Sequence, residues 1–155
     1  MNKNELEICI KKWALEHLLS RNYEVVKIYE KENISKINSN YLKFIYNSGL
    51  CDFICDFTII LKSHKKYEIC LINRMTKSIG LRDVGEMLTY SRICNPEFSF
   101  LISSRGFSSE ISTLLSNKEN IKKLLTYFDK SIIGFQMLND GPKPDSVLPV
   151  SYRKN

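Results

Sequence analysis

Two apolar segments separated by a short polar turn are the feature that most limits how this chain can fold. The first segment covers residues 56–62, the second covers residues 66–73, and only Ser63-His64-Lys65 stands between them. Both segments are apolar over most of their length, as expected for strands that are buried on two faces. Because so short a connection joins antiparallel neighbours, we expect a hairpin inside a larger sheet.

The segments around the hairpin predict an α/β domain with a mixed central β-sheet flanked by helices. Apolar residues at helical spacing between Asn4, the expected cap, and Arg21 predict a helix with one buried side. Its stripe consists of Leu6, Ile10, Trp13, Ala14 and Leu18. The other expected elements are strands over 23–29, 41–46, 98–103 and 131–137, and helices over 81–94, 108–115 and 117–127. We expect one domain over residues 1–138, with a polar insertion over 31–50, and an irregular C-terminal tail over 139–155.

Composition excludes several classes of protein. With 43% apolar and 26% charged residues, the chain is neither disordered nor collagenous. It has no apolar run of about 18 residues and no signal-peptide core, so we expect an intracellular, cytoplasmic protein with no membrane span. Its five cysteines lack a Cys-x-x-Cys pair, which favours free buried thiols over disulfides or a zinc ribbon.

The order of elements and several local patterns carry a resemblance to one known family. The matching stretches are Cys55–Leu61, Asn73-Arg74, Asp83-Val84, Phe98–Ile102 and Gly106-Phe107-Ser108. Over residues 4–116 the chain resembles the restriction-endonuclease-like (PD-(D/E)xK) superfamily, in its archaeal Holliday-junction-resolvase-like branch. Cys55 stands where that family usually has proline, before the aspartate Asp56.

The resemblance implies a site in which two carboxylates hold Mg²⁺ and a lysine assists the attacking water. If Ser63-His64-Lys65 is the turn, Asp56 lies opposite Ile72 and Thr58 lies opposite Cys70. Cys70 and Ile72 then occupy the positions expected for the family's Glu and Lys. Since neither can replace those groups, we expect a degenerate and inactive site with no cofactor.

An active site would need carboxylates and a lysine from elsewhere in the chain. In that case the expected catalytic residues are Asp56, Glu68 and Lys77, with Asp56 and Glu68 as ligands of Mg²⁺. Other residues that could reach the site are Arg74 from the turn and Glu5 or Glu7 from the first helix. The plainer alternative for Asp56 is a strand-entry residue that hydrogen-bonds a turn.

Positive charge gathers around the hairpin and the helix that follows it. The chain has a net charge of +6, and residues 62–105 hold eight basic and four acidic residues. The candidate nucleic-acid-binding residues are Lys62, Lys65, Lys66, Arg74, Lys77 and Arg82. Phosphate contacts of this kind give salt-sensitive binding without sequence readout, although a solvated basic face is the alternative.

These observations predict a nucleic-acid-binding or structural protein, with DNA as the expected partner and a homodimer or an active nuclease or helicase as a further partner. A divergent Mg²⁺-dependent DNA endonuclease is the second hypothesis. A protein-interaction module without a nucleic-acid role is the third.

Overall fold

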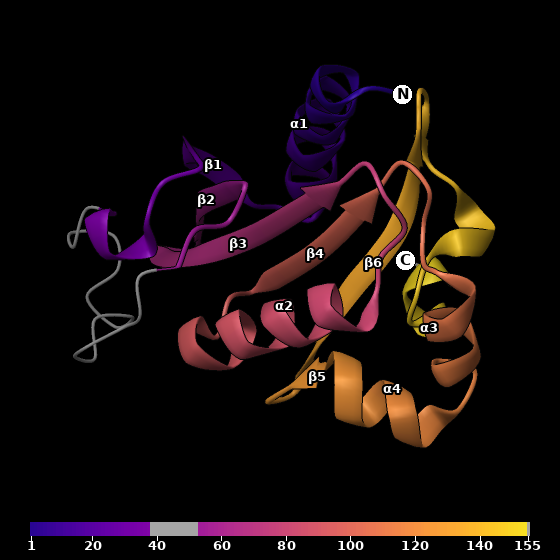
Figure 1. Ribbon diagram of the computed structural model, residues 1–155. Coiled ribbons are helices and arrows are strands. Elements are labelled where there is room, and N and C mark those ends of the chain that lie inside the picture. Colours follow the sequence, from indigo (N-terminus) through magenta and orange to yellow (C-terminus); the bar gives the residue numbers. More distant parts are fainter. Residues whose placement is uncertain (38–52, 155) are drawn as a thin grey trace.

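The predicted hairpin lies within a seven-stranded mixed sheet in the computed structural model, which describes residues 1–37 and 53–154 (Figure 1). The strand order is β1-β2-β3-β4-β6-β5, and β7 pairs with the same edge of β6 as β5 does. The bounds are β1 Glu24–Glu30, β2 Phe57–Ser63, β3 Lys66–Met75, β4 Phe98–Ser103, β5 Thr126–Tyr127, β6 Lys130–Leu138 and β7 Gly141–Pro142. β1, β2 and β3 are antiparallel neighbours, whereas β3, β4 and β6 run parallel. The prediction of an α/β domain with a mixed sheet flanked by helices is confirmed.

Helices cover both faces of the sheet (Figure 1). The helix α1, Lys3–Ser20, covers one face with Leu6, Ile10, Ala14 and Leu18. The other face is covered by α2 Leu81–Cys94, α3 Ser109–Leu114 and α4 Lys118–Leu125. Because alternate strand residues point to opposite faces, Cys70 and Ile72 pack towards α1 while Ile69 and Leu71 pack towards α2.

Two details of the helices differ from the predictions. Asn2, not Asn4, caps α1, since its side chain accepts from the Glu5 amide at 2.9 Å and the Glu5 carboxylate accepts from the Asn2 amide at 2.8 Å. The last predicted helix ends at Leu125, because Thr126–Tyr127 turns back to pair with β6. The predicted strand over 41–46 lies outside the described residues.

The C-terminal segment, predicted as an irregular tail, contains the short strand β7 and two 3-10 turns, and it is fastened to the domain. Leu148 exchanges two backbone hydrogen bonds of 2.9 Å with Gly134 of β6. Tyr152 lies against α1, where its hydroxyl is 2.6 Å from Nε2 of His17. The segment therefore covers part of the β6 edge and of the α1 face.

His17 is enclosed by aromatic rings beneath this segment. It stacks on Trp13 with ring centroids 4.9 Å apart and meets Phe100 edge-on at 5.7 Å. Burial, together with the positive charge of Arg21, lowers the pKa of His17 from 6.5 to about 4. Trp13 and His17 thus belong to the packing of the fold.

The lowered pKa of His17 predicts a stability change in mild acid. Between pH 6.5 and about 4 the unfolded chain binds a proton at this residue that the folded chain does not, so stability should fall as pH decreases through that range. We expect the urea midpoint of the native protein to fall between pH 7 and pH 5. His17→Gln should be less stable at pH 7 but should lose most of that pH dependence. An NMR titration giving His17 an ordinary pKa near 6.5 would contradict this.

Candidate functional site

Asp56 lies where three strands meet, immediately before β2. Its backbone N–H donates to Oδ1 of Asn73 at 3.1 Å, and its Oδ2 accepts from the backbone N–H of Arg74 at 2.9 Å. Its carbonyl accepts from the Lys31 amide, just after β1, at 3.0 Å. Asp56 therefore closes the hairpin at the carboxyl end of β3, which agrees with the interpretation of a strand-entry residue.

A second carboxylate reaches the same place from α1. Oε1 of Glu7 accepts from Nε of Arg74 at 2.9 Å and from Nη2 at 2.5 Å, and Nζ of Lys31 lies 3.3 Å from the same oxygen. Nη2 of Arg74 is also 4.0 Å from Oδ1 of Asp56. We call Glu7, Lys31, Asp56 and Arg74 the Arg74 cluster. The two negative and two positive charges of this cluster sum to zero.

Arg74 is the most enclosed member of the Arg74 cluster. Its side chain is 7% exposed, against 25% for Glu7 and 24% for Asp56. Burial raises the pKa of Glu7, but hydrogen bonds from Arg74 and Lys31 outweigh it, so the pKa of Glu7 lies below its ordinary value. The Glu7 carboxylate therefore stays ionised beside the guanidinium.

The carboxylate oxygens of the Arg74 cluster suit a guanidinium better than Mg²⁺. Mg²⁺ needs near-octahedral oxygen ligands, yet Oε1 of Glu7 and Oδ2 of Asp56 already accept hydrogen bonds. Arginine also stays protonated at neutral pH, so Arg74 cannot take a proton from water as a lysine base could. Within residues 1–37 and 53–154 no group of three His, Cys, Asp or Glu side chains is arranged to hold a metal ion.

The predicted register of the hairpin was wrong by one residue. Phe57, not Asp56, pairs with Ile72, and Thr58 pairs with Leu71 rather than Cys70. The turn contains only His64 and Lys65, both with positive φ (47° and 71°), so Ser63 pairs directly with Lys66. Asp56 consequently lies beside Asn73 and Arg74, one step further along β3 than predicted.

The structure does not bring together the predicted catalytic residues Asp56, Glu68 and Lys77. Glu68 pairs with Leu61 near the start of β3, and its carboxylate lies 3.2 Å from Nζ of Lys66. Lys77 follows β3, is 72% exposed, and lies 3.8 Å from Asp83. The predicted metal ligands Asp56 and Glu68 are thus at opposite ends of the hairpin.

The six predicted nucleic-acid-binding residues divide into two groups. Lys62, Lys65 and Lys66 surround the hairpin turn, whereas Arg74, Lys77 and Arg82 lie at or beyond the other end of β3. The ten residues of β3 span about 30 Å at the usual rise of a strand, so the two groups are separate surfaces.

Arg105 is a third cation near the loop that follows β3, and it was not among the nucleic-acid-binding residues predicted from the sequence. Arg105 follows β4, and two hydrogen bonds join its loop to the loop that carries Lys77: Oγ of Ser104 donates to the Thr76 carbonyl at 3.1 Å, and the Ile79 amide donates to the Gly106 carbonyl at 2.8 Å. Lys77, Arg82 and Arg105 are all exposed. We call these three the loop cations.

Sequence reasoning named Glu7 and Arg74 as groups that could reach Asp56, but it missed Lys31. The position of Lys31 just after a predicted strand was the available signal, because that strand neighbours β2.

Comparison of the chain with protein-family models, with curated proteins and with solved structures gives no match. None of the helices in the described part of the chain is long and apolar enough to cross a membrane.

Proposed function

We propose that this chain is a nucleic-acid-binding protein with a nuclease-like arrangement whose carboxylates serve the fold rather than catalysis. The observation that carries the proposal is Arg74, which is buried and neutralises Glu7 while its amide binds Asp56. In the resembled nucleases these carboxylates would hold a metal ion. Here Cys70 and Ile72, at the positions expected for the family's Glu and Lys, are buried apolar residues, and Arg74 follows them on the same face of β3.

The loop cations are the surface that we expect to meet phosphates. They lie at the same end of the sheet as the Arg74 cluster, and only Lys77 has a carboxylate partner, Asp83, among the ion pairs of the described residues. At the hairpin turn, by contrast, Lys66 pairs with Glu68 and Lys62 lies 5.4 Å from the centre of the Tyr67 ring. A cation without an internal partner gains more from a phosphate, because it gives up no existing contact.

Gel-shift titrations of duplex, branched and single-stranded DNA should show binding that weakens steeply with salt and occurs without cleavage in Mg²⁺ or Mn²⁺. Lys77→Glu/Arg82→Glu should weaken binding at least about tenfold at low salt and reduce the salt slope by about two, as expected for two lost phosphate contacts. Lys122→Glu/Lys123→Glu makes the same charge change on α4 and should have little effect.

Other outcomes would replace the proposal. Equal losses in the two double variants would show that net charge rather than the loop cations governs binding. Absence of any shift at low salt would favour a protein-interaction module.

A Mg²⁺-dependent nuclease is the second candidate, favoured by the two carboxylates that meet at Arg74. Metal-dependent cleavage that Asp56→Asn abolishes would establish it and overturn the non-catalytic role of the cluster.

A further inference from the structure

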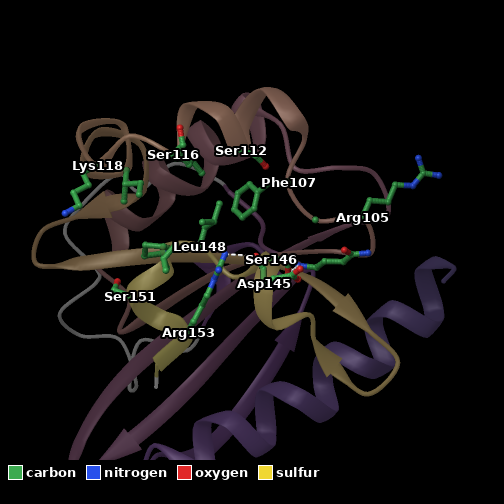
Figure 2. Close-up of a pocket in the computed structure, with 16 residues that line it drawn as sticks. Arg105, Phe107, Ser112, Ser116, Lys118, Asp145, Ser146, Leu148, Ser151 and Arg153 are labelled. Carbon is green, nitrogen blue, oxygen red and sulfur yellow. Dashed lines mark hydrogen bonds between the residues drawn. The ribbon is translucent and has the colours of Figure 1, made fainter.

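A cavity of about 680 Å³ lies at the carboxyl ends of β4 and β6, well apart from the Arg74 cluster (Figure 2). Its walls come from the loop after β4, from α3 and α4, and from the C-terminal segment. Arg74 lies on the sheet face covered by α1, whereas this cavity lies on the face covered by α2, α3 and α4. Its volume is within the range of about 300–1,000 Å³ that is usual for small-ligand sites.

Much of the cavity wall is apolar and firmly held. Phe107, Leu115, Ile121 and Leu148 line it. The Phe107 ring lies directly on the backbone of Gly134, where an added Cβ would be 2.3 Å from Cζ of the ring. Leu148 is fixed by its two hydrogen bonds to Gly134. The walls are therefore built by close packing and suit an apolar ligand body.

Positively charged side chains also line the cavity. Figure 2 shows Arg153 extending from the C-terminal segment into the cavity beside Leu148 and Ser146, while Arg105 points away from it. Nε of Arg153 donates to the Val147 carbonyl at 2.7 Å and Nη2 donates to the Asp145 carbonyl at 2.5 Å. These bonds hold the guanidinium in place and leave further N–H donors, since arginine has five.

The charges around the cavity do not cancel. Arg153 and Lys118 both line it, and neither forms a salt bridge with a carboxylate in the part of the chain that the structure describes. The lining acid, Asp145, is 75% exposed and lies 3.8 Å from Nζ of Lys143. Arg153 and Lys118 are both exposed, so the unbalanced charge is positive and lies where the cavity meets solvent.

We propose that this cavity binds a small organic carboxylate with an apolar body. The apolar part contacts Phe107, Leu115 and Leu148, and the carboxylate faces Arg153, while Lys118 adds positive charge at the cavity rim. A planar guanidinium matches a carboxylate with paired hydrogen bonds.

Octanoate and octanol are suitable probes because they share the apolar body and differ in charge. In ¹H–¹⁵N NMR titrations of the full chain, octanoate should bind at least tenfold more tightly than octanol and shift amides around Phe107 and Leu148. Ser112→Trp, on the exposed lining of α3, should fill the cavity and weaken both ligands at least tenfold. Ser109→Trp, exposed on the same helix but outside the lining, is the matched control and should bind as the native chain does.

Arg153→Met tests the charge. It should reduce octanoate binding to the level of octanol and leave octanol unchanged. If this variant does not fold, because Arg153 also braces the C-terminal segment, Lys118→Met should reduce the preference for octanoate several-fold. Equal binding of the two probes to the native chain, equal behaviour of the two tryptophan variants, or no binding of either probe would overturn the proposal.

Discussion

Arg74→Met should lower the free energy of unfolding by roughly 2–3 kcal/mol, somewhat less than the loss for a fully buried ion pair. Methionine keeps most of the apolar stem of Arg74 but removes the guanidinium, whose exposure is only 7%. Glu7 would then keep Lys31 alone, 3.3 Å away, and Asp56 would keep only the backbone amide. The loss comes from two partly buried carboxylates left without their shared cation. Urea unfolding at pH 7 measures it.

Lys77→Met is the control for Arg74→Met, since it removes one cation from an exposed pair at the end of the same strand. The Lys77 side chain is 72% exposed and lies 3.8 Å from Asp83, so its loss should change stability by less than about 0.5 kcal/mol. Equal effects of the two substitutions would contradict the structural role of the Arg74 cluster.

The pKa of Glu7 gives the Arg74 prediction a pH signature. The pKa of Glu7 in the folded chain lies below the ordinary 4.5, so its ion pairing stabilises the fold fully above that value and progressively less as pH falls below it. The stability difference between the native chain and Arg74→Met should therefore shrink below pH 4.5. It should remain nearly constant between pH 6 and pH 8.

The strands could be predicted from the sequence because each depends on a local run of apolar residues. Phe98–Ser103 is an uninterrupted buried strand and was predicted with its bounds. The hairpin register could not be predicted, because it depends on a two-residue turn with positive φ at His64 and Lys65. Such turns favour Asn and Gly, so the residues themselves gave no sign that the turn is so tight.

The Arg74 cluster was predictable only as a set of alternatives. Glu7 and Arg74 are far apart in sequence, and their contact depends on how α1 packs across the sheet. The apolar stripe of α1 shows which side is buried, but it does not show which strand end Glu7 will reach. The one-residue register error also placed Ile72 opposite Asp56 and so concealed the adjacency of Asp56 and Arg74.

Gly134→Ala should be among the most damaging small substitutions in this chain. The new Cβ would lie 2.3 Å from Cζ and 2.8 Å from Cε2 of Phe107, distances that packed atoms do not adopt. The backbone cannot easily retreat, because Gly134 is bonded to Leu148 on one side and pairs with Leu101 of β4 on the other. Overpacking of this kind costs about 1–3 kcal/mol, and we expect the upper end of that range in urea unfolding.

Three further variants test whether the Phe107 ring is the cause of that loss. Gly85→Ala is the matched control: nothing lies within 4 Å of its added Cβ on the exposed side of α2, so it should stabilise the protein by about 0.5–1 kcal/mol through helix propensity. Phe107→Ala removes packing of its own, yet Phe107→Ala/Gly134→Ala should be much less destabilised than the sum of its single changes. Additive losses would mean that strand geometry, rather than the Phe107 ring, requires glycine at position 134. A strong coupling would show that the ring and the bare backbone beneath it form one packed unit, the same unit that shapes the proposed carboxylate cavity.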